Sequence, residues 1–179
     1  MTKKIAIIYH GSYSNTLSEH IQKGAEGVKV VSYDVEHIDN LNLLDDADAI
    51  IFGSPTYFGS VSASMKNFMD STIDIWENKK WNNKIAAGFT YSSALDGNKL
   101  SALMTIFTFA EQHGMIWVGL DLKSCEKKEG YNTELNRFGS WAGLMAQSPH
   151  KNNQADNLSD LQTAEYFGAR IAEVIKKFG

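Results

Sequence analysis

Five short apolar runs alternate with helix-like stretches along this chain, and that alternation limits the folds it can adopt. The runs have the length and composition of β-strands, and the stretches between them have apolar residues at helical spacing. The expected strands cover Ile5–Tyr9, Val28–Tyr33, Ala49–Phe52, Ile85–Phe89 and Met115–Val118. Strands that alternate with helices form a parallel sheet with right-handed crossovers and helices on both faces. The sequence therefore predicts an α/β protein with a doubly wound five-stranded parallel sheet, as a single domain over residues 1–179.

Helical spacing predicts four helices between these strands and a fifth at the end of the chain. The first four cover Thr16–Glu26, a short stretch at Asn40–Asp45, Ser62–Ser71 and Lys99–His113. The last helix starts near Ser159 and Gln162, which form a capping-box pattern. Leu122–Asp156 shows no clear periodicity, and structureless connections of about 35 residues are uncommon in compact domains and usually functional.

Composition excludes several classes of protein. The net charge is −4 and there is no basic run, so no nucleic-acid partner is expected. No apolar stretch approaches the roughly 18 residues of a membrane span, and the apolar start is too short for a secretory signal. The single cysteine, Cys125, excludes an intramolecular disulfide and a cysteine metal cluster. His10, His20, His37 and His150 lack metal-ligand spacing, so a cytoplasmic protein with no metal and no membrane partner is expected.

The loop after the third predicted strand is the most informative segment of the chain. The apolar run Ala49–Phe52 stops at Gly53, and the loop then reads Ser54, Pro55, Thr56, Tyr57, Phe58 and Gly59. Ligands of open α/β sheets gather at the carboxyl ends of buried parallel strands. Two aromatic rings at such an end suit a flat ligand better than a sugar or a metal. A proline turn with two surface aromatics is the alternative interpretation.

A polar loop follows the first predicted strand. After Gly11, four polar side chains occur within five residues, namely Ser12, Ser14, Asn15 and Thr16. The helix that begins there offers backbone N–H groups and the positive end of its dipole to an anion. The loop has no Lys or Arg, so a bound phosphate would be held by neutral donors. Such residues also cap helices, but one cap would suffice, and the excess favours phosphate binding.

Three familiar phosphate-related patterns are absent. The chain has no Gly-x-Gly-x-x-Gly after the first strand, although Asp34 lies where a ribose-binding carboxylate is sought, and it has no Walker Gly-Lys-Ser/Thr. A response-regulator receiver needs an acidic pair after the first strand and an aspartate at the end of the third. The chain has Tyr9-His10 and Phe52-Gly53 at those positions, which excludes that class.

A third loop of small and hydroxyl residues follows the fourth predicted strand, in the order Thr90, Tyr91, Ser92, Ser93 and Ala94. Because parallel strands deliver their carboxyl ends to one edge of a sheet, the three loops are expected to face a single crevice. His113 precedes Gly114 at the end of a predicted helix, a pair that is typical of a helix C-terminus. A functional role for His113 is the alternative interpretation.

Together these loops resemble the flavodoxin-like FMN proteins, most closely the WrbA-type NAD(P)H:quinone oxidoreductases, from Ile5 to about Gly119. The resemblance implies the sheet order 2-1-3-4-5 and FMN as cofactor, with its isoalloxazine ring at Pro55–Gly59. The FMN-binding residues that it implies are Ser12, Tyr13, Ser14, Asn15, Thr16, Leu17, Pro55, Thr56, Tyr57, Phe58, Gly59, Thr90, Tyr91, Ser92, Ser93 and His113. It further implies that Trp76 and Tyr13 face the substrate, and that His113 is a catalytic donor toward the flavin or the substrate.

The chain departs from that family in its phosphate loop. The family typically reads Ser-x-x-Gly where this chain has Gly11 and Ser14, so the first phosphate hydroxyl is expected from Ser12. The third loop is poorer in glycine than the family's. The connection between the second and third strands is shorter, so a shared tetramer does not follow from the resemblance.

The implied activity is the transfer of two electrons from NAD(P)H, through the flavin, to a quinone or another small acceptor. Trp76, Trp81 and Trp141 are candidate walls of a substrate cavity, and core packing explains any one of them equally well. A flavodoxin-type FMN electron carrier without its own substrate remains an alternative, as does a flavin-free regulatory protein. A homodimer or homotetramer is expected from the resemblance alone.

Overall fold

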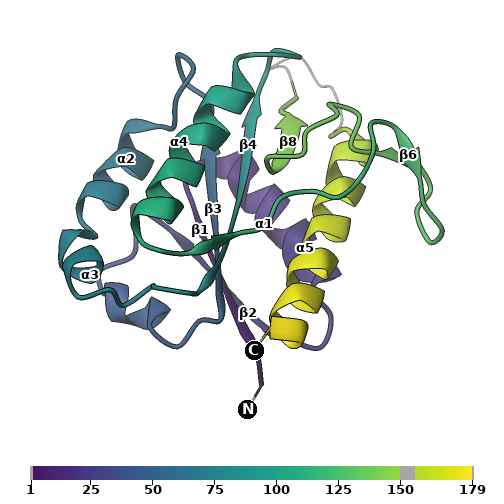
Figure 1. The fold of residues 1–179 in the computed structure, drawn as a ribbon. Helices are drawn as coiled ribbons and strands as arrows, with labels where there is room; N and C mark the ends of the chain where they lie inside the picture. The colour runs from purple at the N-terminus through teal and green to yellow at the C-terminus, as the bar shows by residue number, and fades with distance from the viewer. Residues whose placement is uncertain (1, 150–155, 179) are drawn as a thin grey trace.

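A computed structural model describes residues 2–149 and 156–178 and shows a parallel sheet with helices on both faces (Figure 1). The main strands are β1 (Lys4–Tyr9), β2 (Lys29–Asp34), β3 (Ala49–Pro55), β4 (Ile85–Ser92) and β5 (Ile116–Trp117). Their order is β2-β1-β3-β4-β5, and every neighbouring pair is parallel. The doubly wound α/β fold and the strand order 2-1-3-4-5 are therefore confirmed.

The outer edge of β4 is shared by two short strands. β5 pairs only with the start of β4, at Ile85 and Ala86. A sixth strand, β8 (Leu144–Gln147), runs parallel to the other end of β4, from Phe89 to Ser92. The segment expected to lack periodicity thus contributes to the sheet, and it also forms a small hairpin of β6 (Glu126–Lys127) and β7 (Glu134–Leu135).

The helices cover the two faces of the sheet unequally (Figure 1). They are α1 (Ser12–Gly24), α2 (Ala63–Asp70), α3 (Ile73–Glu77), α4 (Lys99–Gln112) and α5 (Leu158–Phe178), with a 3₁₀ turn, η1, at Leu41–Leu44. One core lies between the sheet and α1 and α5, and a second lies between the sheet and α2, α3 and α4. Trp81 is fully buried in the second core, so it is not a cavity wall. None of the helices in the described ranges is both long and apolar enough to cross a membrane.

Two helix starts differ from the sequence predictions. α1 begins at Ser12 and not at Thr16, so the polar loop after β1 forms the first turn of the helix. The capping box at the start of α5 is wrong. The Asn157 side chain accepts the Ser159 N–H, and Gln162 instead accepts the N–H of Thr133.

The packing of α1 against α5 depends on two glycines without side chains. A Cβ atom on Gly168 of α5 would overlap the carbonyl oxygen of Ile21 in α1. A Cβ atom on Gly24 would overlap the carbonyl oxygen of Glu165 in the same way. Backbone lies directly against backbone here, so no side-chain rearrangement could make room for a methyl group.

We expect Gly168→Ala to lower the free energy of unfolding by about 2 kcal/mol or more, because overpacking strain of roughly 1–3 kcal/mol combines with backbone displacement. In an open helical site the same change would stabilise the protein by about 1 kcal/mol through helix propensity. Urea unfolding of the variant measures the difference. Glu173→Ala, on the exposed side of α5, is the control. Unchanged or increased stability of Gly168→Ala would show that the two helices can separate at no cost.

Candidate functional site

Three strand ends meet at Gly11. This residue has φ +90°, and a Cβ atom on it would lie 2.8 Å from the hydroxyl oxygen of Tyr91 and 3.9 Å from the ring carbons of Pro55. Gly11 follows β1, Pro55 ends β3, and Tyr91 lies near the end of β4. The structure therefore brings the three predicted loops to one place at the carboxyl edge of the sheet.

The first turn of α1 has the donors that an anion requires. Gly11 is the N-cap and provides no side-chain hydrogen bond, and the Asn15 N–H is the one that donates to its carbonyl, at 3.2 Å. The N–H groups of Ser12, Tyr13 and Ser14 have no intrahelical acceptor, as in the first turn of any helix. The Ser14 hydroxyl and the Tyr13 hydroxyl are buried and have no hydrogen-bond partner among the residues that the structure describes. Unpartnered buried donors beside a helix N-terminus fit a phosphate group.

The other predicted residues of this turn differ in their positions. Ser12 is exposed at the start of α1. The Asn15 side chain is already used, because it accepts from the Tyr9 hydroxyl at 2.6 Å and donates to Glu19 at 2.9 Å. Leu17 is fully buried in the core and offers a ligand no polar group.

The aromatic loop after β3 is a tight turn with a strained centre. Tyr57 and Ser60 exchange two backbone hydrogen bonds, of 2.9 and 3.1 Å. Phe58 and Gly59 between them have φ values of +49° and +76°, the positive values of a type I′ turn. Positive φ is uncommon for a bulky residue and costs about 1 kcal/mol or more. Phe58 is fully exposed, so its ring is not held in the core of this chain.

The second and third loops are joined by direct hydrogen bonds. The Thr56 N–H donates to the Tyr91 carbonyl at 2.7 Å, and the hydroxyls of Thr56 and Thr90 are 2.7 Å apart. Thr90 also donates to the Ser54 carbonyl at 2.7 Å, and its side chain is fully buried. The Thr90 hydroxyl therefore fixes the two strand ends to each other.

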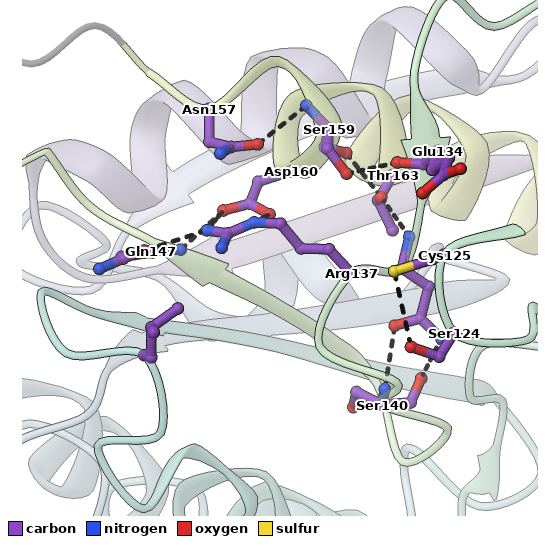
Figure 2. Close-up of polar contacts among 12 residues, drawn as sticks. Ser124, Cys125, Glu134, Arg137, Ser140, Gln147, Asn157, Ser159, Asp160 and Thr163 are labelled. Carbon is purple, nitrogen blue, oxygen red and sulfur yellow. Dashed lines mark hydrogen bonds and ion pairs between the residues drawn. The ribbon is translucent and has the colours of Figure 1, made fainter.

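A group of polar residues beyond β4 supports the third loop (Figure 2). The Gln147 side-chain amide donates to the Ser93 carbonyl at 2.7 Å. The Gln147 N–H donates to Asp160 at 2.8 Å. Arg137 binds the same carboxylate through two N–H groups, at 2.7 and 2.8 Å. Asp160 is almost fully buried, so the bidentate pair compensates for the lost hydration of its charge.

Lys99 holds the third loop from its other end. Its ammonium group donates to the carbonyls of Ala94 at 2.6 Å and Leu95 at 2.8 Å, and it lies 4.6 Å from the centroid of the Phe138 ring. Burial lowers the pKa of Lys99 to about 8. No sequence pattern singled out Gln147, Arg137 or Asp160 as part of the site, because the pairing of β8 with β4 is what brings Gln147 and its two partners to the loop. Lys99 directly follows the loop at the start of α4.

The structure does not bring His113 to the three loops. α4 begins after the third loop and runs back along the sheet for 14 residues, which is about 20 Å at 1.5 Å per residue. His113 therefore lies at the opposite edge, where Ile116 pairs with the start of β4. There it packs against Trp81 and Phe109, with ring centroids 4.7 Å apart in each case. The capping interpretation fits this position, and a donor at the strand ends does not.

Trp76 also lies apart from the strand ends. It is half exposed on α3, in a groove of about 710 Å³ between α2, α3 and α4. Ile73 and Met104 give the groove an apolar lining, and Lys66 and Asp70 also line it. Trp141 is exposed between the small hairpin and β8. His150 lies outside the described residues.

The site thus defines a class of protein, a doubly wound α/β protein with a phosphate-compatible helix start beside an exposed aromatic turn at the strand ends. Residues 39–122 match the family model described as NADPH-dependent FMN reductase. The chain is 34% identical over 177 residues to the flavodoxin FldP of Pseudomonas aeruginosa, covering 96% of each chain. It is 38% identical over 134 residues to an NAD(P)H dehydrogenase (quinone) of Archaeoglobus fulgidus, covering 75% of this chain and 62% of that protein.

A solved structure extends the comparison to the whole fold. The flavodoxin, WrbA-like protein from Agrobacterium tumefaciens superposes with a TM-score of 0.78 at 32% identity, covering 99% of this chain and 100% of the other. The chain belongs to the flavodoxin-like FMN proteins and is close to their WrbA type.

The buried position of His113 predicts a pH-dependent stability. Burial lowers its pKa from 6.5 to about 4, so the folded protein keeps it neutral where the unfolded chain binds a proton. The free energy of unfolding should therefore fall as the pH drops from about 6.5 toward 4, by at most about 3 kcal/mol from this group.

Urea unfolding between pH 4.5 and 7.5 measures this contribution when wild type is compared with His113→Gln, which retains a polar group facing Thr72. Other acidic groups titrate equally in both proteins, so the two stability curves should converge at low pH. Parallel curves across the range would contradict the assignment.

Proposed function

We propose that this protein is an FMN-dependent oxidoreductase that passes two electrons from NAD(P)H to quinones. The observation that carries the proposal is the meeting of three strand ends at Gly11, with an unpartnered buried Ser14 hydroxyl on one side and the Tyr57–Ser60 turn on the other. The family model and the quinone-reducing relative of A. fulgidus support it.

The first turn of α1 would hold the phosphate of FMN. Three N–H groups, the Ser12 and Ser14 hydroxyls and the dipole of a 13-residue helix provide neutral donors and a partial positive charge. No cation is needed, because hydrogen bonds to a charged acceptor are stronger than those between neutral groups. Tyr13 lies beside these donors, with its ring 5.1 Å from that of Tyr91.

The other two loops would hold the ring system. Pro55 and Thr56 form a rigid end to β3, and the N–H groups of Phe58, Gly59 and Ser93, which have no acceptor among the described residues, would meet the polar edge of a flavin. Tyr57 and Phe58 would flank the ring, and offset aromatic contacts add roughly 0.5–1.5 kcal/mol beyond burial. Bound FMN would supply the redox chemistry itself, taking up hydride from NAD(P)H and returning two electrons to the acceptor. The chain contributes orientation and exclusion of water.

His113, Leu17 and Thr90 are not part of the proposed contact set, because their side chains lie in the core or at the far edge. Trp76 is not a wall of the site within one chain. We also propose that copies associate, as a homodimer or homotetramer. The exposed apolar side chains of Phe58, Ile73, Trp76, Leu100 and Met104 support this, and size-exclusion chromatography with light scattering tests it.

A flavodoxin-type electron carrier is the second candidate. The 34% identity to a flavodoxin over nearly the whole chain favours it directly. The two candidates share the FMN site and differ in whether a nicotinamide and a quinone reach the flavin. The full exposure of Phe58 supports the enzyme, because a carrier would be expected to cover the ring with its aromatic residues.

An absorption spectrum and a turnover assay separate these functions. We expect the purified protein, supplemented with FMN, to show a bound-flavin spectrum, and NADH or NADPH to bleach it. Adding benzoquinone should then sustain nicotinamide oxidation. Binding of FMN without nicotinamide-dependent turnover would favour the carrier, and no binding of FMN even at millimolar concentration would refute both functions.

A further inference from the structure

The hydroxyl of Tyr91 lies inside the anion-binding turn of α1, although Tyr91 belongs to β4. Its oxygen is 2.8 Å from the position that a Cβ atom of Gly11 would take. The backbone N–H groups of Tyr13 and Ser14 are close enough to favour the charged form of the phenol. The Tyr91 hydroxyl, from the third loop, therefore lies beside the hydrogen-bond donors of the first loop.

The ring that carries this hydroxyl is held firmly. Tyr91 is only 9% exposed and packs edge-on against Tyr13, with ring centroids 5.1 Å apart. Its backbone is fixed on both sides, because its carbonyl accepts the Thr56 N–H and its strand pairs with β3 and β8. A ligand entering the turn would meet the hydroxyl where it stands, since the ring is buried against Tyr13 and its strand is paired on both sides.

The turn also lacks a hydroxyl at its first position. Gly11 has no side chain, and any residue there would both adopt a strained positive φ and collide with Tyr91. Residues Gly11 to Leu17 include no Lys or Arg, so every side-chain donor that this turn itself offers to a phosphate is neutral. An additional O–H group at this point would increase the number of donors without adding charge.

From this geometry we infer that Tyr91 is a phosphate ligand of the site, donating its hydroxyl from β4 to the phosphomonoester held by the first turn of α1. The inference deepens the proposed FMN function and rests on it. It assigns Tyr91, which the family resemblance implies only as an FMN-binding residue, to the phosphate end of the cofactor. The phosphate would then be bound by groups that follow two strands, the first turn of α1 after β1 and the Tyr91 hydroxyl of β4.

The protonation state agrees with a donor role. Burial raises the pKa of Tyr91 to about 12, so the phenol keeps its proton throughout the neutral range. A protonated phenol offers one O–H to an anionic oxygen, and hydrogen bonds to charged groups are among the stronger ones in proteins. The Ser14 hydroxyl, fully buried in the same turn and close to the Tyr91 phenol, is a second donor to the same group.

Tyr91→Phe tests the inference, because it removes the hydroxyl and keeps the ring packing. Dissociation constants are measured by fluorescence titration for FMN and for riboflavin, which lacks the phosphate. We expect the FMN constant to rise about 10-fold and the riboflavin constant to stay unchanged. Tyr131→Phe, which removes a hydroxyl from the segment before β7, is the matched control and should change neither.

A second measurement does not need the flavin. Inorganic phosphate at millimolar concentration should raise the melting temperature of the wild-type protein more than that of Tyr91→Phe. If wild type binds phosphate in this way but not FMN, the proposed function fails and the role of Tyr91 stands.

Three outcomes would overturn the role of Tyr91. FMN affinity unchanged in Tyr91→Phe shows that the hydroxyl makes no contact with the phosphate. Tighter FMN binding shows that the hydroxyl obstructs the turn. An equal loss of FMN and riboflavin affinity shows that the hydroxyl orders the site in general. In all three cases FMN binding by wild type would still support the proposed function.

Discussion

The close approach of Gly11, Pro55 and Tyr91 is the constraint on which the rest of the site depends. Three parallel strands deliver their ends to one edge, but the ends converge only because position 11 has no side chain. The positive φ of Gly11 turns the chain directly from β1 into α1, without a longer loop. As a result the donors of α1 lie in contact with residues of β3 and β4, and one ligand can touch all three.

The third loop owes its position to one neighbouring residue, Lys99, and to residues far away in the sequence. Gln147 and Lys99 hold the backbone carbonyls of 93–95 from opposite ends, and Arg137 and Asp160 hold Gln147 in turn. Lys99 and Arg137 both lie against the Phe138 ring, at 4.6 and 4.2 Å from its centroid. Cation–π contacts strengthen when they are removed from water, so the partly buried ring helps to offset the cost of burying two cations. The segment between β5 and α5 therefore acts on the site through this loop.

The sequence was sufficient for the sheet and for the convergence of the three loops at one edge. Continuous apolar runs such as Ile5–Tyr9 and Ala49–Phe52 predicted β1 and β3, and the polar residues after them predicted where a ligand would be bound. It was not sufficient for β8, because Leu144–Gln147 is a four-residue strand whose stability comes from pairing with β4. His113 shows the same limit. The resemblance implied a donor role for it, and only the direction of α4 shows that it lies apart from the three loops of its own chain.

The exposed Phe58 bears on which molecules the site can serve. Its positive φ costs free energy. The ring is fully exposed, so packing in the core does not offset this cost. The Tyr57–Ser60 turn enforces the conformation through two backbone hydrogen bonds, so the ring is held outward beside the predicted flavin edge. An aromatic side chain fixed in this way is prepared for a contact from outside the chain. A nicotinamide, a quinone or a second copy of the protein would each gain from meeting it, whereas a carrier that shields its flavin would be better served by a ring folded over the site.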